Sequence, residues 1–155
     1  REMLFKVNAL LPRFDFGSEY GQERFLIALQ SCFEKNDDRE LVSLFAGNVV
    51  GTQEAAYSDD GVTQQAVMRT GVANKENVIV PNPVHLVPYR TFIEVRQPGS
   101  DFIFRAGKGK DDAPTFKLVS ADGGLWKLQA LANVKGYLME ALEGIPNREQ
   151  ITIIA

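Results

Sequence analysis

Apolar residues recur every three or four positions in two segments near the start of the chain. The first segment follows Ser18, a residue type favoured as a helix N-cap, and its apolar face holds Phe25, Leu26, Leu29 and Phe33. This spacing predicts an amphipathic helix over residues 19–33. A second, shorter helix is predicted over residues 38–46, because Asn36-Asp37-Asp38 supplies cap residues and Gly47 supplies a stop.

From Val49 onward the pattern changes to a period of two, which is typical of half-buried strands. Residues 49–57 and 62–70 flank Ser58-Asp59-Asp60-Gly61, and Asp-Gly is a frequent hairpin turn. We therefore predict a hairpin with one solvated face. Residues 77–80 run into Pro81-Asn82-Pro83, which excludes a central strand there and favours a turn or an edge strand.

A second hairpin is predicted for residues 91–96 and 101–105, which alternate in polarity around Gln97-Pro98-Gly99-Ser100. The polar loop Gly107-Lys108-Gly109-Lys110-Asp111-Asp112 then leads into a strand over residues 115–120. Since strands are densest here, we expect the main sheet in this half of the chain.

Five apolar residues near the C-terminus step by three or four positions and form one helical stripe: Leu128, Leu131, Val134, Leu138 and Leu142. We predict a long helix that begins at Asp122 or Gly123. Gly144 and Pro146 end it, because neither residue type continues a helix.

This last segment has an alternative interpretation, in which residues 115–120 pair with 125–130 as a hairpin around 121–124; the helix is preferred. Residues 151–155 are apolar and β-branched, so they would add an edge strand. Together these elements predict a single α+β domain over residues 1–155. It has an antiparallel sheet of about five to seven strands and two or three helices, the longest near the C-terminus and packed on one face.

Composition narrows the function classes. The chain has 155 residues, 45% of them apolar, and a formal net charge of −3, which does not indicate a bulk polyanion binder. Its single Cys excludes an intramolecular disulfide and a Cys-based zinc site, and its single His, His85, excludes two-His metal motifs. We therefore expect neither a metal nor a cofactor.

The chain also lacks the sequence signals of a membrane protein. No run approaches the roughly 18 consecutive apolar residues needed to cross a bilayer, and the first residues lack the apolar run of a secretory signal. Because the chain begins with Arg rather than Met, the sequence leaves open whether a leader segment precedes residue 1. We expect a cytoplasmic protein without a membrane partner.

Several apparent motifs have simpler explanations. Residues 107–110 lack the spacing and following helix of a P-loop, so a solvated loop is favoured. Asp59-Asp60, which with Glu54 could hold a metal, lies in a predicted turn, where Asp is common; Asp111-Asp112 has the same explanation. His85 and Cys32 do not form a legible nucleophile–base pair, and Cys32 is expected to pack beside Phe33.

Aromatic and cationic side chains concentrate in the predicted sheet and the start of the last helix. Exposed on one face, they could stack bases and contact phosphates, as single-strand binding proteins do. The alternative, favoured by the acidic pI and the lack of Lys/Arg clusters, is that the phenylalanines (Phe104 included) form the core under the last helix and the arginines are ordinary surface residues. The candidate binding residues are Tyr89, Arg90, Phe92, Arg96, Phe102, Arg105, Lys108, Lys110 and Trp126.

Four segments together carry a resemblance: residues 23–31, 58–64, 80–98 and 121–128, with Pro-Tyr-Arg-Thr-Phe and Ala-Asp-Gly-Gly-Leu-Trp as their most specific parts. The combination resembles uncharacterised proteins encoded by bacteriophages and prophages of Gram-positive bacteria. The resemblance covers roughly residues 20–143. It implies expression in the cytoplasm of an infected bacterium, and it supplies no catalytic residues.

The leading functional hypothesis is therefore a non-enzymatic phage accessory protein that acts by binding, with single-stranded nucleic acid in replication or recombination as one target. The alternative is a protein–protein interaction or anti-defence protein that binds a host factor or a small ligand. An enzyme is least expected. A homodimer is our preferred assembly, formed through a sheet edge at residues 77–80 or 151–155.

Overall fold

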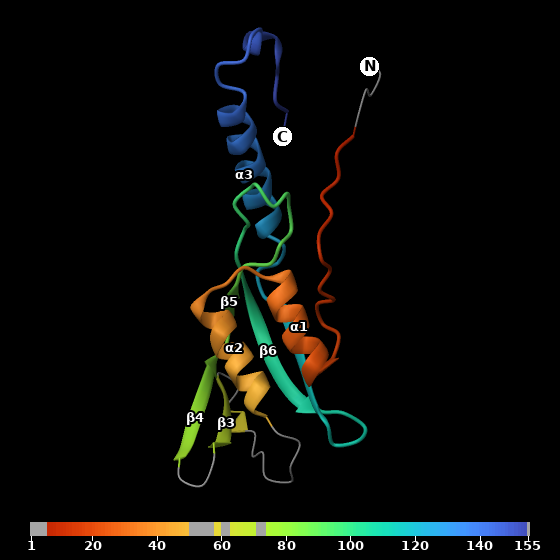
Figure 1. The fold of residues 1–155 in the computed structure, drawn as a ribbon, viewed down its shortest axis with the longest axis vertical. Coiled ribbons are helices and arrows are strands. Elements are labelled where there is room, and N and C mark those ends of the chain that lie inside the picture. Colours follow the sequence, from red (N-terminus) through yellow and green to blue (C-terminus); the bar gives the residue numbers. More distant parts are fainter. Residues whose placement is uncertain (1–5, 50–57, 60–62, 71–73, 155) are drawn as a thin grey trace.

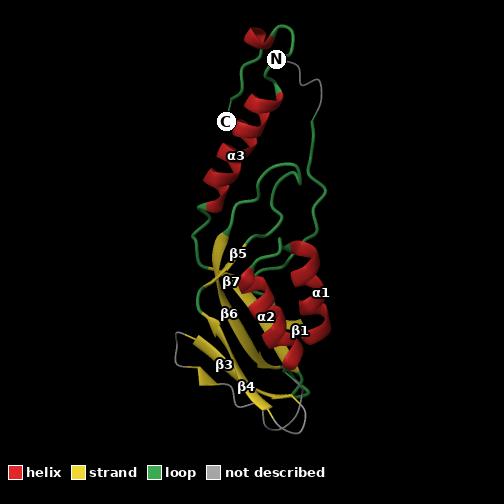
Figure 2. Ribbon diagram, turned by 60° about the vertical axis from the view of Figure 1, so that its left-hand side comes forward, coloured by secondary structure: helices red, strands yellow, loops and turns green. Residues whose placement is uncertain are grey.

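The computed structural model describes residues 6–49, 58–59, 63–70 and 74–154. Two helices cover one face of an antiparallel sheet, and a third helix projects from one end of that sheet (Figures 1 and 2). The main sheet has four strands in the order β1-β7-β6-β5, which is fewer than the five to seven expected. Its strands are β1 (Tyr20–Gly21), β5 (Val84–Leu86), β6 (Ser100–Lys108) and β7 (Pro114–Ser120).

The two covering helices are α1 (Gln22–Cys32) and α2 (Asp37–Asn48), close to the predicted segments. Helix α1 begins later than residue 19, because residues 20–21 pair with β7 as strand β1. Helix α2 begins where the sequence indicated: the Asn36 side chain accepts a hydrogen bond from the backbone N–H of Arg39, which caps the first turn.

A second, three-stranded sheet has the order β2-β3-β4, with β2 (Ser58–Asp59), β3 (Thr63–Thr70) and β4 (Asn74–Pro81). Strand β3 confirms the predicted arm at residues 62–70, and β4 is an edge strand, as the prolines indicated. Asp59 lies in β2 opposite Gln64. Most of the other predicted arm, residues 49–57, lies outside the described residues.

A phenylalanine core lies between the main sheet and the helices α1 and α2. Strand β6 alternates strictly, so that Phe102 and Phe104 point inward and are fully buried while Ile103 and Arg105 point outward. The largest buried rings are Phe25, Phe33, Phe45, Phe102, Phe104 and Phe116. They contact one another edge to face or stacked, as in Phe25 on Phe116 with ring centres 5.2 Å apart.

The long C-terminal helix α3 (Trp126–Ala141) exists as predicted, but it does not pack on the sheet. It projects from the end of the sheet, with Ala130 as the one buried residue of its sixteen, all of which are described. The prediction that this longest helix packs on a sheet face is therefore wrong, whereas helices do cover one face, which α1 and α2 fill. Within the described part of the chain, no helix is long and apolar enough to cross a membrane.

In the part of the chain that the structure describes, two of the predicted strands, at residues 91–96 and 151–155, do not form. Residues 91–96 form a loop, and β6 pairs with β5 instead. The side chain of Gln97 satisfies this loop's backbone: its oxygen accepts from the N–H groups of Arg90 and Thr91, and its amide donates to the carbonyls of Phe92 and Val95. Residues 151–154 are not a strand; they follow the short 3-10 helix η1 (Arg148–Gln150).

Candidate binding surface

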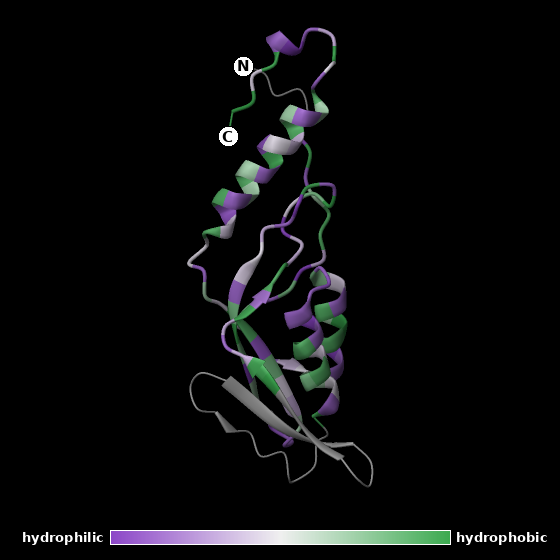
Figure 3. Ribbon diagram, turned by 90° about the vertical axis from the view of Figure 1, so that its left-hand side faces the viewer, coloured by the Kyte–Doolittle hydropathy of each residue, from purple (hydrophilic) through white to green (hydrophobic). Residues whose placement is uncertain are grey.

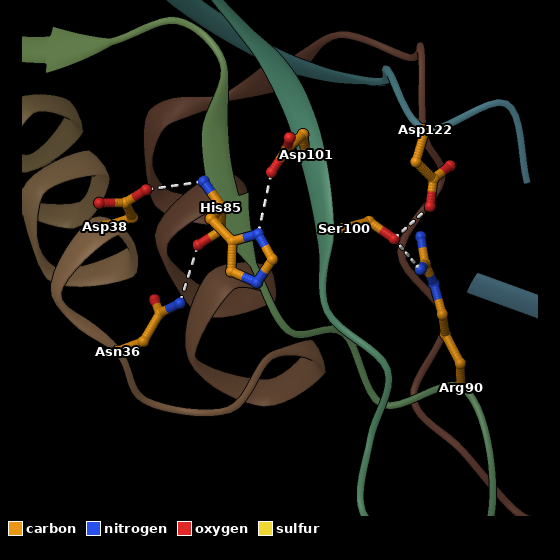
Figure 4. Close-up of polar contacts among 7 residues, drawn as sticks. All are labelled: Asn36, Asp38, His85, Arg90, Ser100, Asp101 and Asp122. Atoms are coloured by element: carbon orange, nitrogen blue, oxygen red, sulfur yellow. Dashed lines mark hydrogen bonds and ion pairs between the residues drawn. The ribbon is translucent and has the colours of Figure 1, made fainter. Parts of the chain in front are cut away.

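Arg90 is the centre of a polar cluster that joins the sheet to α3 (Figure 4). Its guanidinium donates to Ser100 Oγ, and Ser100 Oγ donates to Asp122 Oδ2. The same guanidinium lies over three rings, closest to that of Trp126, with 4.4 Å from its central carbon to the ring centre, and farther from Phe102 and Phe16. Arg90 therefore holds the base of α3 against the sheet.

The two charges of this cluster support each other. Burial lowers the pKa of Arg90, and the charge of Asp122 opposes that shift. Burial also works against ionisation of Asp122, but hydrogen bonds from Ser100, from the Gly124 N–H and from Ser120, together with the charge of Arg90, bring its pKa down from 3.8 to about 2. Both groups are ionised at neutral pH, and the hydroxyl of Ser100 bridges them.

A second polar cluster surrounds His85 on the opposite side of β6 (Figure 4). Its ring Nδ1 lies 2.9 Å from Asp101 Oδ1, its backbone N–H donates to Asp38, and its carbonyl accepts from Asn36. The imidazole lies over Gly99, where a Cβ would come within 2.4 Å of Nε2. These bonds tie β5 to the start of α2.

The two clusters meet at a shallow pocket of about 310 Å³, lined by His85, Ser100, Asp101, Asp122 and Trp126 among others. A carboxylate-oriented imidazole can act as a general base. The hydroxyl of Ser100, however, accepts from Arg90 and donates to Asp122 rather than to the imidazole. The pocket can accept a polar group, and its geometry does not indicate nucleophilic catalysis.

No cation site is formed by the acidic residues in the described ranges. Within residues 6–49, 58–59, 63–70 and 74–154, no three His, Cys, Asp or Glu side chains gather as metal ligands. Asp111 and Asp112 are exposed at the turn between β6 and β7, where Asp112 adopts a positive φ of 55° that this residue type tolerates. Glu54 and Asp60 lie outside the described residues.

The nine candidate binding residues do not form one surface. Phe102 is fully buried, so it cannot stack on a base, and Arg90 and Trp126 are occupied with each other. Tyr89 and Phe92 are half-buried in the loop before β6, and they line a groove that, among the described residues, no Arg or Lys side chain lines. The hypothesis of an exposed aromatic sheet face is therefore wrong, and the favoured alternative of phenylalanines in the core is confirmed, because the alternation of β6 directs them inward. The helices that cover them are α1 and α2, and not the last helix.

The remaining cations lie elsewhere. Arg105 stands on the outer face of the main sheet directly opposite Lys117, beside a pocket of about 480 Å³ that Glu19 also lines. Lys108 and Lys110 are exposed near the β6–β7 turn. The exposed side chain of Arg96 is separate again, and its backbone carbonyl accepts a hydrogen bond from Asn133 of α3.

Exposed apolar side chains gather at one end of the molecule. We call this the projecting end: residues 6–12, the loop 87–97 and residues 125–154. Its N-terminal segment and loop enclose an open groove of about 500 Å³ that Tyr89, Phe92 and Ile93 line. Its exposed large apolar residues are Val7, Leu10, Ile93, Leu125, Leu128, Leu131, Tyr137, Leu138, Met139, Ile145, Ile151 and Ile154.

Sequence reasoning missed this surface because it assigned the α3 stripe to the core. A signal was present: Leu125, Tyr137 and Met139 are apolar but lie off the stripe, so the segment is apolar around much of its circumference. Such a helix needs burial on more than one side. Comparisons of the chain with protein-family models, with curated proteins and with solved structures gave no match.

Proposed function

We propose that this protein is a non-enzymatic binding protein that works through protein–protein contacts made by its projecting end. The observation that carries the proposal is the exposure of the leucines of α3, 68% for Leu128 and 53% for Leu131. Contiguous exposed apolar surface is uncommon on soluble monomers and marks interaction sites. Figure 3 shows apolar residues along the length of α3, beyond the reach of either sheet.

The polar clusters support binding rather than catalysis. The Ser100 hydroxyl and the Asp122 carboxylate are both hydrogen-bonded within the polar cluster around Arg90. His85 has an orienting carboxylate in Asp101, yet the pocket between them offers no free hydroxyl or thiol, since Cys32 is buried in the core. We therefore propose a role without a reaction step.

A second candidate function is binding of a phosphate backbone, and the outer sheet face favours it. Arg105 and Lys117 are direct cross-strand neighbours, and like charges in that position destabilise a sheet unless an anion lies between them. The apolar side chains beside them, Ile103 and Val119, are aliphatic, so this face supports backbone contacts rather than base stacking.

The resemblance to phage and prophage proteins supports the cytoplasm of an infected bacterium as the setting of this role. In that setting the projecting end would bind a phage or host protein, which agrees with an interaction or anti-defence protein. The apolar character of the surface predicts a partner with an apolar patch of its own.

The proposal is tested by measuring which bacterial proteins the immobilised protein and its matched variants retain from a bacterial lysate. The tagged wild type is compared with a stripe variant, Leu131→Glu with Leu138→Glu, and with a control variant, Gln129→Glu with Gln150→Glu. The control adds the same two charges at exposed positions outside the stripe. We expect a bacterial protein, identified by mass spectrometry, that the wild type and the control retain and the stripe variant does not. Equal retention by all three would contradict the proposal.

The second candidate has its own readout. Fluorescence anisotropy with a labelled oligothymidine at low salt would show binding that weakens steeply with added salt and is lost in Arg105→Ala with Lys117→Ala. Binding that the α3 stripe variant abolishes instead would place the nucleic acid on the projecting end.

A further inference from the structure

We propose that α3 binds the α3 of a second copy of this chain, and that the two helices lie antiparallel. The contact runs along a stripe that differs at one member from the stripe predicted from the sequence, because Lys135 replaces the half-buried Val134: Leu128, Leu131, Lys135, Leu138 and Leu142. This inference rests on the proposed function, because it names the occupant of the same surface.

The spacing of the stripe is that of a coiled-coil seam. Its members are separated by three, four, three and four residues, which places them at successive a and d positions of a heptad. The contacts of α3 with its own chain use another face: Trp126 meets Arg90, Ala130 is buried, and Asn133 bonds the loop. At about 100° per residue, the stripe lies roughly 150° around the helix from that face. It is therefore free for a partner.

The charges of α3 are arranged against its own dipole. The helix has no acidic residue in its first turn and no basic residue in its last turn. Lys127 instead stands at the positive N-terminal end, while Glu140 stands at the negative C-terminal end, with Glu143 just beyond. In an antiparallel pair each Lys127 comes beside the partner's C-terminal turn and each Glu140 beside its N-terminal turn. Charges that are unfavourable in one helix become complementary between two.

Lys135 selects the same orientation. In a parallel pair in register, this a position faces its own copy, so two ammonium groups would meet in an apolar seam. In an antiparallel pair an a position faces a d position, and Lys135 packs its methylene stem on the partner's Leu131 while its ammonium reaches water.

The position of α3 in the molecule also fits. Because α3 projects from one end of the sheets (Figures 1 and 2), antiparallel pairing sets the bodies of the two copies, each formed by the two sheets with α1 and α2, at opposite ends of the helix pair. The helix is about 24 Å long for its sixteen residues, at about 1.5 Å per residue. Parallel pairing would bring both bodies to the same end, where they compete for space.

Sedimentation velocity on the purified protein tests the pairing. Across concentrations on the order of 1–500 µM we expect the wild type and the control variant (Gln129→Glu with Gln150→Glu) to form dimers. In the stripe variant (Leu131→Glu with Leu138→Glu) the dissociation constant should rise at least ~30-fold, with an unchanged circular dichroism spectrum. A wild type that is monomeric throughout, or a dimer that the stripe variant leaves intact, would overturn the proposal.

Cysteine cross-linking tests the orientation. Pairing Lys135 with the partner's Leu131 places the two-fold axis at residue 133, so in an antiparallel pair the two Ala132→Cys thiols, one residue away, meet and form an intermolecular disulfide. Gln129→Cys, on another face, provides the control, and the wild type provides the background, since Cys32 is buried. Efficient cross-linking through Lys135→Cys in place of Ala132→Cys indicates a parallel pair and refutes the antiparallel arrangement.

The two proposals fail separately. If the wild type is monomeric but its stripe still retains a bacterial protein, the second copy is refuted and the protein-binding role stands. If the wild type dimerises through the stripe and retains nothing else, the self-pairing stands and the role as a binder of other proteins is removed.

Discussion

The body of this protein, formed by the two sheets with α1 and α2, and its projecting end use similar apolar patterns with opposite results. Phe102 and Phe104 of the body have no exposed surface. Rings from α1, α2 and β7 surround Phe104, and the rings of Phe16 and Phe33 pack on Phe102. Leu128 and Leu131 of α3 recur just as regularly, yet more than half of each is exposed. A regular apolar pattern therefore predicts an element that needs a partner, and it does not say whether the same chain supplies one.

The junction between these regions is polar. Arg90, Ser100 and Asp122 join the loop, β6 and the start of α3 through hydrogen bonds and ring contacts. A small charged junction holds α3 in place without burying its leucines. The following predictions test how different the two regions are, beginning with the largest effect.

The first prediction contrasts a core ring with an exposed leucine. Phe104→Ala should lower the free energy of unfolding by about 3–5 kcal/mol, because it leaves a cavity among Phe25, Phe45 and Phe116. Leu128→Ala should change it by no more than about 0.5 kcal/mol. Both are measured by denaturant unfolding at a protein concentration where the chain is monomeric. Equal losses would show that the core continues into α3.

The second prediction concerns the cap that fixes α2. Asn36→Ala removes the side chain that accepts from the Arg39 N–H and donates to the His85 carbonyl, so the free energy of unfolding should fall by about 1–2 kcal/mol. Ser31→Ala is the control, since its hydroxyl bonds only within α1, and it should cost less than about 0.5 kcal/mol. A control loss as large as that of Asn36→Ala would contradict the role of the cap.

The third prediction uses pH to test the junction. The pKa of Asp122 is about 2 in the folded chain, below its ordinary 3.8, so its ionised form stabilises the fold above pH 3.8. That contribution, about 1 kcal/mol for a partly solvated carboxylate, is lost as pH falls toward 2. Asp122→Asn should therefore flatten the decline of stability between pH 5 and 2. An unchanged slope would show that the carboxylate contributes nothing there.

The fourth prediction addresses α3 alone. Gly136 lies in the middle of the helix with open space around its Cβ position, so Gly136→Ala should stabilise α3 by up to about 1 kcal/mol. Slower amide hydrogen exchange within α3, with unchanged exchange in the body, would show that the helix opens independently. Gly144→Ala, at a φ of 79°, provides the opposite control and should speed exchange at the end of α3.

Part of the candidate site was predictable and part was not. The sequence placed Arg90 and Trp126 separately among the candidate binding residues, and the structure brings them into contact with each other, which leaves no open stacking site between them. It also suggested that residues 91–96 form a strand. Their alternation was misleading because the Gln97 side chain supplies the hydrogen bonds that a neighbouring strand would have supplied. Local pattern does not reveal such a competitor.

The sequence by itself determined the local elements: the helices α1, α2 and α3, the strands β3 and β7, and the edge position of β4 beside its prolines. Backbone periodicity, caps and prolines act within a few residues, which is why they can be read from the chain. Only the tertiary structure decided which apolar faces are covered. Burial depends on segments that lie far apart in the sequence, so the same kind of stripe became a core at Phe102 and an exposed surface at Leu128.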